Sequence, residues 1–512
     1  MWTNADASYS STFVHVRPHP ISGKVSRRHL GTVRSAALCF ALLLCSCAAA
    51  PAQPASVLSP IAPPVAPTST TQIAAISTAP AILALPSRCA DLPADLPGSA
   101  SAPPAEAKQP EDTGEAQSQS PDASKMDTTM PIAYDANTNT IMLNGGAPMT
   151  LPAISRALGR DDLLHELVPG EWLLNANLRI GKGAAVTIAG PQVRRLKLRS
   201  DANGFVWLKA FGAQLTFADT CVTSWDSGSN TVDTNDTDGR SFVLARDGAR
   251  MEIHNSELSY LGYFANESYG VAWRQPGTTG TAINSRFGHN FYGLYSYEAS
   301  DLVIRGNEVY YSVRYGIDPH TRANRLVIEG NISHHNGKQG IILAEECSDS
   351  TIRGNTVYAN VLHGIVIYQR SNNNLVVDNI SYGNGLQGIN VNDSSFNTIR
   401  GNTVYDNAEA GIGMGQNAND NTLIGNTVRD NRKDGISFYS DATGNTLREN
   451  IVSGNTRYGM YVKSAGNSIA SGNQIFGNAI GIYLNVTPAP DVSLETNHVY
   501  DNRDANVRAA GK

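Results

Sequence analysis

The feature of this sequence that most limits how it can fold is an asparagine that returns every 23 or 24 residues. The members of this series are Asn307, Asn331, Asn355, Asn379, Asn402, Asn426, Asn450, Asn473 and Asn497. A glycine keeps the same period and is followed each time by Ile, Leu, Val or Met, at Gly270, Gly293, Gly316, Gly340, Gly364, Gly388, Gly411, Gly435, Gly459 and Gly481. A fixed period of this length, kept by two series in phase, is typical of solenoid proteins.

Each period contains three short runs of alternating apolar residues separated by Gly and Asn, as in 354–360, 364–368 and 374–379. Such runs are typical of strands of three to five residues joined by turns, where Gly and Asn tolerate left-handed backbone angles. A helical repeat would need apolar residues at three- and four-residue spacing and few glycines. We therefore predict an all-β chain, a right-handed parallel β-helix with three strands per coil. A second internal asparagine ladder is expected through Asn336, Asn360, Asn384, Asn407, Asn431, Asn455 and Asn478.

The repeat also predicts which side chains share a face. Neighbouring coils lie roughly 4.8 Å apart, so the nine steps from Gly270 to Gly481 span on the order of 43 Å, a length that suits an extended polymer. Positions one and three after each Gly are apolar, as at Ile365 and Ile367, and are expected to face the core. Positions two and four then point outward.

Composition divides the chain into four segments: an export signal over residues 1–50, a disordered tether over 51–130, an N-terminal cap over 131–180 and the β-helix over 181–505. The tether is dominated by Ala, Pro, Ser, Thr and Gln and cannot bury enough apolar area to fold. In the cap, Thr150 is a candidate N-cap for a short helix that ends before Gly159. This α-helical cap would cover the open end of the β-helix.

The export signal is predicted from Arg27 and Arg28, which precede the apolar run 36–44. The run ends in a stretch that resembles a bacterial lipobox, with Cys47 as the lipidated residue and thus as a lipid anchor. Ordinary cleavage near 48–50 is the alternative. The run is shorter than the ~20 residues that a spanning helix needs. Each version places the folded part outside the cytoplasm, in the periplasm, on a membrane as a lipoprotein, or secreted.

Charge and cysteine content exclude several classes of function. The formal net charge is −6, so no global basic field attracts nucleic acid, and an acidic ligand must be held by local Arg or Lys. After the export segment only Cys89, Cys221 and Cys347 remain, too few for a disulfide framework or a zinc site. One pair can form, and the sequence leaves open which. The sequence contains no Ca²⁺-binding nonapeptide, and we expect no metal, no cofactor and a monomer.

One coil breaks the pattern. Gly316 is followed by Ile317, Asp318, Pro319 and His320, so two titratable groups take outward positions two and four. Pro removes a ladder donor and should weaken the strand where neighbouring coils carry an apolar residue. A loss of stability beside two titratable groups is typical of a functional site.

Outward positions on adjacent coils extend this candidate site. Position two holds Tyr295 and then Asp318. Position four holds Arg274, Tyr297, His320, Ala344, Tyr368 and Asn392 in coil order. If the register holds, the first three of these form one column. Taken singly, each fits an ordinary solvated face; as a set, a cation, phenols, an imidazole and a carboxylate favour a function.

An exposed row of Tyr and Asn suits sugar binding, because rings contact pyranose faces and amides bond hydroxyls. Tyr295, Tyr368 and Asn392 are therefore candidate substrate-binding residues.

The titratable groups suit proton abstraction from a uronate. His320 is a candidate general base, supported by the neighbouring carboxylate of Asp318. Arg274 can neutralise a uronate carboxylate and so acidify the adjacent C–H bond, and Tyr297 can return a proton across the ring. These steps amount to C5 epimerisation. If the intermediate instead expels the 4-linked sugar, the result is β-elimination.

Several motifs carry a resemblance to a known family. They are Tyr315-Gly316-Ile317-Asp318-Pro319-His320, Ser268-Tyr269-Gly270-Val271 with Trp273-Arg274, Tyr292-Gly293-Leu294-Tyr295 with Tyr297-Glu298-Ala299, Pro169-Gly170-Glu171-Trp172, and Ser259-Tyr260-Leu261-Gly262-Tyr263. Over roughly residues 140–500 the chain resembles the periplasmic-type mannuronan C5-epimerases of alginate biosynthesis. The resemblance implies a right-handed β-helix with a long polysaccharide groove, His320 as the catalytic base and Asp318 in support. It also implies an acidic polysaccharide as partner, with a polysaccharide-export complex as a further candidate.

Two positions depart from the family pattern. The family usually has a second Asp after the His, where this chain has Thr321. On the next coil the family has an Arg that neutralises the substrate carboxylate, and with a one-residue gap this chain has Glu345 there. A Glu cannot neutralise a carboxylate, so Arg274 or Arg370 is expected to take that role.

Three functions follow. The first is a C5-epimerase that converts mannuronate to guluronate residues in alginate or an alginate-like polymer. The second is a lyase on the same fold, because both reactions begin with the same proton abstraction. The third is a non-catalytic polysaccharide-binding β-helix, to which Glu345 lends weight.

Overall fold

The computed structural model describes residues 85, 87–89, 131–439, 441–463, 465–485, 494 and 496–510. All of them belong to the compact unit Pro80–Lys512. The predicted export signal, Cys47 and most of the predicted tether lie outside the described residues. Within the described ranges, no helix is long and apolar enough to cross a membrane.

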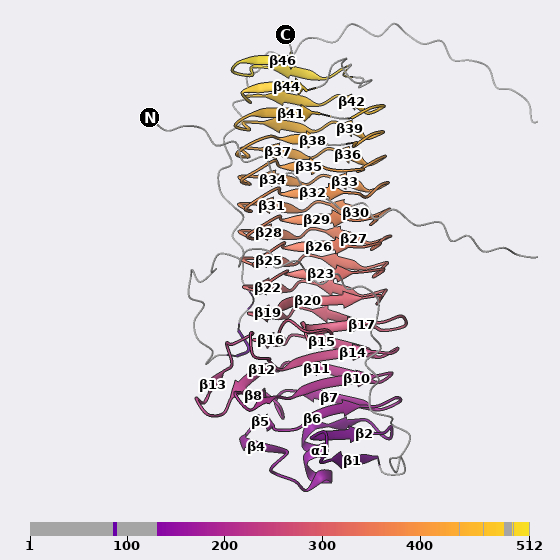
Figure 1. Ribbon diagram of the computed structural model, residues 1–512, viewed down its shortest axis with the longest axis vertical. Coiled ribbons are helices and arrows are strands. Elements are labelled where there is room, and N and C mark those ends of the chain that lie inside the picture. The colour runs from indigo at the N-terminus through magenta and orange to yellow at the C-terminus, as the bar shows by residue number, and fades with distance from the viewer. Residues whose placement is uncertain are drawn as a thin grey trace, which may run out of the picture. The chain divides into compact units, whose positions relative to one another are not determined.

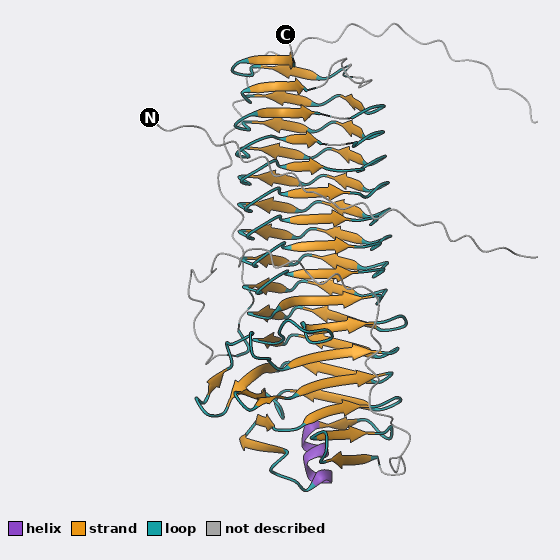
Figure 2. Cartoon of the chain, in the orientation of Figure 1, coloured by secondary structure: helices purple, strands orange, loops and turns teal. Residues whose placement is uncertain are grey.

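In the described part of the chain, three long sheets are stacked from successive coils, and each coil adds one strand to each sheet (Figures 1 and 2). Almost all neighbouring strands are parallel. The antiparallel exceptions are the pairs β1–β2, β4–β5, β8–β9 and β12–β13. The prediction of an all-β parallel solenoid with three strands per coil is confirmed.

The strands of sheet A, which carries the candidate site, are β1 Ile132–Asp135, β2 Thr140–Leu143, β6 Asn177–Ile180, β10 Trp207–Phe211, β14 Phe242–Arg246, β17 Gly270–Arg274, β20 Tyr292–Tyr297, β23 Ile317–His320, β26 Ile341–Ala344, β29 Ile365–Tyr368, β32 Ile389–Asn392, β35 Ile412–Met414, β38 Ile436–Phe438, β41 Tyr458–Val462, β44 Ile480–Leu484 and β46 Ala505–Ala509.

The strands of sheet B are β3 Met149–Thr150, β7 Ala185–Ala189, β11 Gln214–Ala218, β15 Arg250–His254, β18 Thr279–Ile283, β21 Val303–Arg305, β24 Val327–Glu329, β27 Thr351–Arg353, β30 Leu375–Val377, β33 Thr398–Arg400, β36 Thr422–Ile424, β39 Thr446–Arg448 and β42 Ile469–Ser471.

The strands of sheet C are β4 Leu164–Val168, β5 Glu171–Leu174, β8 Arg195–Asp201, β9 Gly204–Phe205, β12 Cys221–Asp226, β13 Thr231–Val232, β16 Glu257–Ser259, β19 Arg286–Gly288, β22 Glu308–Tyr310, β25 Ile332–His334, β28 Thr356–Tyr358, β31 Ile380–Tyr382, β34 Thr403–Tyr405, β37 Thr427–Arg429, β40 Ile451–Ser453, β43 Gln474–Phe476 and β45 His498–Tyr500.

The helix α1, Leu151–Leu158, forms where the sequence predicts it. Thr150 at the N-cap is extended but makes no side-chain capping bond, and Gly159 ends the helix in the left-handed conformation. Leu151 and Ile154 are buried, and the helix contacts β1, β3 and β7 at the end of the stack (Figure 2). Parallel pairing already joins β2 to β6, so the cap shares its sheets with the β-helix.

The periodic glycines are required by close packing between coils. A Cβ on Gly364 would lie 2.1 Å from Ser381 Oγ and 2.5 Å from the carbonyl oxygen of Gly388. Our expectation of left-handed angles applies instead to residues such as Gly354, with φ 61°, just before a ladder asparagine. At most periodic glycines, therefore, the missing side chain rather than left-handed φ is what the fold uses.

The asparagine ladders bond one coil to the next inside the stack. Asn355 Nδ2 donates to Asn379 Oδ1 and to the carbonyl of Ile328, each at 2.9 Å. Because every polar group of such a side chain has a partner, the buried amides are satisfied. The second predicted ladder is present as well, with Asn360 Nδ2 donating to Asn384 Oδ1 at 3.0 Å. The sequence analysis missed a third ladder, through Asn374, Asn397, Asn421 and Asn445.

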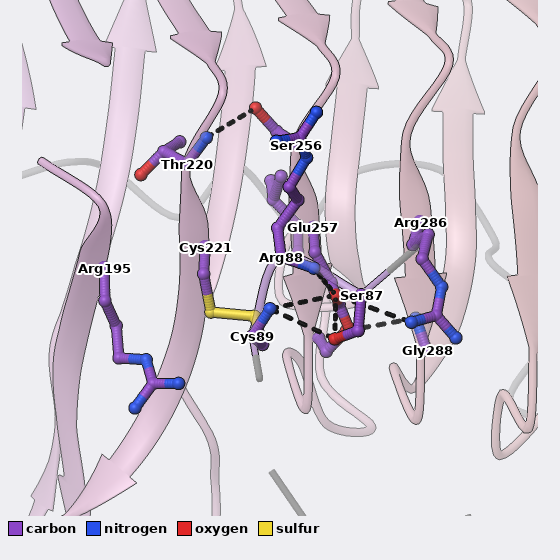
Figure 3. The surroundings of a disulfide bond; sticks show 12 residues. Ser87, Arg88, Cys89, Arg195, Thr220, Cys221, Ser256, Glu257, Arg286 and Gly288 are labelled. Atoms are coloured by element: carbon purple, nitrogen blue, oxygen red, sulfur yellow. Dashed lines mark hydrogen bonds and ion pairs between the residues drawn. A yellow bond between two sulfur atoms is a disulfide. The ribbon is translucent and has the colours of Figure 1, made fainter. Parts of the chain in front are cut away.

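A disulfide between Cys89 and Cys221 fixes a short part of the predicted tether against sheet C (Figure 3). Ser87 Oγ and the backbone N–H of Arg88 both donate to the buried Glu257 carboxylate at 2.8 Å. Cys347 is buried and is not disulfide-bonded. The structure thus resolves which pair forms, which the sequence left open.

Candidate functional site

The outward residues of neighbouring sheet A strands meet in the register that the repeat predicts. Arg274 of β17 pairs with Tyr297 of β20, and Tyr297 pairs with His320 of β23. On the same strands Tyr295 pairs with Asp318. Arg274, Tyr297 and His320 therefore form one column on the outer face of sheet A, with Tyr295 and Asp318 in the column beside it.

His320 is held by a hydrogen-bond chain that runs to the next coil. Thr321 Oγ1 lies 2.8 Å from His320 Nδ1 and donates to Glu345 Oε2 at 2.7 Å. Because the Thr321 hydroxyl donates its proton to the Glu345 carboxylate, its oxygen accepts a hydrogen bond from Nδ1–H of the imidazole. This tautomer leaves Nε2 of His320 as the unprotonated nitrogen. Glu345 Oε2 also lies 3.7 Å from Nδ1, on the same side of the ring as Thr321.

Asp318 points to the outer face but is covered, with an exposed fraction of 1%. Neither carboxylate oxygen has a hydrogen-bond partner among the described residues. Burial raises the pKa of Asp318 to about 6, and the charges of His320 and Lys338 limit this rise. A buried carboxylate without hydrogen bonds destabilises the fold, so its retention here needs a functional explanation.

An aromatic cluster covers this part of sheet A. Its buried members Tyr292 and Tyr295 stack at 5.5 Å between ring centroids, and Tyr269 packs edge-on against both. Burial, together with the nearby Asp318, holds the pKa of Tyr295 well above its usual value, so its phenol stays protonated. Tyr315 extends the cluster toward the next coil. These rings give the site an apolar wall close to Asp318, whose charge acts on both Tyr292 and Tyr295.

Two cations border the site. The Arg274 guanidinium lies 4.6 Å from the centre of the Tyr297 ring, and Nη1 donates to Asn266 Oδ1 at 2.9 Å. On the other side, Lys338 Nζ donates to the Tyr315 hydroxyl at 3.4 Å, within electrostatic reach of Asp318.

The remaining predicted residues lie further along sheet A. Tyr368 and Asn392 continue the column of His320 through Ala344, and both are half-buried. Arg370 lies beyond this column in an exposed turn, where its Nη2 is 2.7 Å from Glu346 Oε1. The structure therefore brings Arg274 to the site and pairs Arg370 with Glu346 instead.

Pro319 interrupts strand pairing as expected. Between β23 and β26 only the end pairs, Ile317 with Ile341 and His320 with Ala344, are in ladder register. Pro319 lines an interior space together with the core residues Trp273 and Leu294, so Asp318 and His320 are left on the outer face. The break thus falls within the segment that carries the two titratable groups.

Sequence reasoning missed Lys338, the covering tyrosines and the link from Thr321 to Glu345. Lys338 lies in a turn, outside the counted strand positions. The tyrosines did leave a signal, because Tyr269, Tyr292 and Tyr315 each precede a periodic Gly on three successive coils. Nothing in the sequence alone showed that they cluster beside the buried Asp318.

The chain was compared with protein-family models and with known proteins. The sequence model described as a right-handed beta helix region matches residues 220–381 and 269–428, and that of a periplasmic copper-binding protein (NosD) matches residues 379–509. The mannuronan C5-epimerase of Pseudomonas putida is 34% identical over 195 residues, which are 35% of this chain and 37% of the relative. The mannuronan C5-epimerase AlgG of Azotobacter vinelandii is 29% identical over 222 residues, 41% of each chain.

Over these aligned residues the chain is similar to the mannuronan C5-epimerases. The aligned region spans only about two fifths of the length of these curated epimerases. The crystal structure of the periplasmic alginate epimerase AlgG matches with a TM-score of 0.59 at 23% identity, over 72% of this chain and 85% of that one. This match bears on the fold alone and agrees with the predicted right-handed β-helix. In the ranges that the structure describes, no three His, Cys, Asp or Glu side chains are grouped to hold a metal ion.

Proposed function

We propose that the chain is a C5-epimerase acting on a polyuronate, converting mannuronate to guluronate residues in alginate or an alginate-like polymer. The observation that carries the proposal is the hydrogen-bond chain from Glu345 through Thr321 to His320, beside the buried Asp318. It leaves an imidazole nitrogen available as a base on the face where an extended polymer can lie. The kinship to mannuronan C5-epimerases supports the choice of substrate.

In the proposed reaction His320 Nε2 takes the proton from C5 of the bound uronate. The imidazolium that forms is stabilised by Glu345 through Thr321 and by the nearby Asp318. Electrons from the broken C–H bond move into the uronate carboxyl group. That group needs a cation or hydrogen-bond donor to hold the added charge.

Arg274 and Lys338 are the proposed partners of the uronate carboxylate, one on each side of the aromatic cluster. Tyr297, which lies between Arg274 and His320 in the column, returns a proton to C5 from the opposite face. The net result is inversion at C5 without bond cleavage in the polymer. Tyr295, Tyr368 and Asn392 are proposed to bind the sugars along sheet A, whereas Arg370 remains a candidate contact at its edge.

The same first step also permits elimination. If the C4–O4 bond breaks before the proton returns, a double bond forms between C4 and C5 and the polymer is cut. Lyase activity is therefore the second candidate, favoured by the shared base and the shared carboxylate-binding groups.

An extracytoplasmic location is consistent with the disulfide between Cys89 and Cys221, since such bonds persist in oxidising compartments. A lipid anchor at Cys47, association with an export complex and a monomeric state are proposed from the sequence alone. The division at residues 50, 130 and 180 is likewise a proposal.

The test is proton NMR of poly-mannuronate incubated with the protein. We expect guluronate signals for the parent and none for His320→Ala. Unsaturated ends that absorb in the ultraviolet would indicate the lyase instead. Binding of the polymer with no turnover by the parent would overturn the enzymatic assignment and favour a binding protein.

A further inference from the structure

A second aromatic pair on sheet A repeats the pair at the candidate site. Tyr292-Gly293-Leu294-Tyr295 contributes the first pair and Tyr458-Gly459-Met460-Tyr461 the second. Both place one Tyr before the periodic Gly and one at position two. The ring centroids of Tyr458 and Tyr461 are 5.5 Å apart, as are those of Tyr292 and Tyr295.

The second pair lies on the same face as the first. Tyr461 pairs with Ser437 of the preceding coil, and the same column continues back through Gly413, Asn390 and Val366. This is the position-two column that contains Tyr295. Seven coil steps, from β20 to β41, separate the two pairs, or roughly 34 Å.

The second pair is part of a larger group of half-buried rings. Tyr483 stacks on Tyr458 at 4.6 Å and lies 6.1 Å from Tyr461, and Tyr439 packs against Tyr461 from the preceding coil. We call Tyr439, Tyr458, Tyr461 and Tyr483 the distal aromatic cluster. Half-buried tyrosines present both an apolar ring and a hydroxyl to a ligand, which suits a sugar.

A fixed guanidinium lies beside this cluster. Arg457 is 4.8 Å from the centre of the Tyr458 ring and is bonded at 2.8 Å and 2.7 Å to the buried carboxylate of Asp434. These bonds use Nε and Nη2 and hold the side chain in one orientation. Two exposed cations are near: Lys463 directly follows β41, and Arg508 lies on β46, where it pairs with Tyr483. The nearby carboxylate is thus paired and buried, whereas the cations reach the surface.

Between the two aromatic groups the outer face is lined by smaller residues. After Asp318, the position-two column holds the buried Ile342 and then Val366, Asn390, Gly413 and Ser437. A chain that contacts both groups could therefore run along this face without meeting another aromatic side chain in that column. The distal cluster has no counterpart of Asp318 or His320, because Tyr483 and Asn485 hold positions two and four on the coil after Tyr461.

We propose that the distal aromatic cluster, with Arg457, is a non-catalytic subsite that binds the same acidic polysaccharide about seven coils from the catalytic residues. This inference rests on the proposed function for the class of ligand. The rings contact sugar faces and Arg457 faces uronate carboxylates. The subsite aligns a long polymer along sheet A with His320 and raises the affinity for it. Oligomers too short to reach both aromatic groups gain no affinity from the subsite.

The test compares Tyr461→Leu/Tyr483→Leu with Tyr358→Leu/Tyr382→Leu, all in a His320→Ala background so that binding is measured without turnover. The control pair stacks at 5.0 Å on sheet C, away from the proposed groove. Affinities are measured for poly-mannuronate and for a mannuronate tetrasaccharide, which is too short to join the two aromatic groups. Circular dichroism checks that each variant is folded.

For Tyr461→Leu/Tyr483→Leu we expect the affinity for the polymer, relative to that for the tetrasaccharide, to fall about tenfold. The control variant should match its parent. An unchanged ratio would overturn the subsite, as would failure of His320→Ala to bind the polymer. If the same substitutions alter only self-association, measured by sedimentation, the cluster is instead a contact between copies of the chain. If the parent protein shows no epimerisation but Tyr461→Leu/Tyr483→Leu still weakens polymer binding, the subsite is supported and the proposed reaction is rejected.

Discussion

The buried carboxylate of Asp318 leads to a prediction that links stability to function. Asp318→Asn keeps the shape of the side chain and removes its charge. Neither oxygen of Asp318 has a hydrogen-bond partner in the described residues, so the substitution breaks no bond of the folded protein there. We expect Asp318→Asn to abolish turnover and, at neutral pH, to stabilise the fold.

The magnitude follows from the pKa. Burial raises the pKa of Asp318 from an ordinary 3.8 to about 6. The folded state therefore binds this proton more tightly than the unfolded state, and stability falls as pH rises between the two values. Because one pKa unit corresponds to about 1.4 kcal/mol, ionisation lowers the free energy of unfolding by about 3 kcal/mol in total. About 2 kcal/mol of this loss is expected between pH 4.5 and pH 7.5.

The assay is urea unfolding of both proteins at pH 4.5 and pH 7.5. Because long repeat proteins can unfold in parts, hydrogen exchange of the β20, β23 and β26 amides provides a local measure. Asp434→Asn is a matched control, since Asp434 is equally buried but bonded to Arg457, and its loss should destabilise at both pH values. The reasoning is refuted if Asp318→Asn is less stable than the parent at pH 7.5. It is equally refuted if the difference between the two proteins is independent of pH.

Two further predictions concern the hydrogen-bond chain to His320 and the disulfide. Thr321→Val and Glu345→Gln should each lower kcat about tenfold to hundredfold with little change in KM. Because both substitutions break the same hydrogen-bond chain to His320, the kcat of the double variant should be no lower than that of the worse single variant. Thr321→Ser keeps the hydroxyl and should retain activity. Additive losses, or an inactive Thr321→Ser, would contradict this positioning role. Cys89→Ser should lower the free energy of unfolding by about 2–5 kcal/mol, because the disulfide closes a loop with a sequence separation of 132 residues. Cys347 forms no disulfide, so Cys347→Ser opens no loop and serves as the control. If the oxidised parent and Cys89→Ser have the same free energy of unfolding in urea, this prediction is wrong.

The architecture and the site column were predictable because the coils keep a constant length. Counting from each periodic Gly aligned Arg274, Tyr297 and His320 correctly, and strand pairing needs no further information once the period is known. The same count failed to predict burial. Asp318 occupies an outward position and is nevertheless buried beside an aromatic cluster, and such packing depends on rotamers rather than on spacing. The pairing of Arg370 with Glu346 was not predicted for a related reason, since Arg370 lies in a turn beyond the counted strand positions.

The two departures from the family pattern, Thr321 and Glu345, become one feature when seen in the structure. The family places a carboxylate directly after the His and a cation on the next coil; this chain places a hydroxyl after His320 and a carboxylate on the next coil, and the two are hydrogen-bonded. A carboxylate therefore still supports the imidazole, but from the neighbouring coil. Glu345 also occupies the position from which the family neutralises the substrate. In the proposed reaction Arg274 and Lys338, which lie on either side of the aromatic cluster, take that role, so the proposal treats Glu345 as part of a rearranged site.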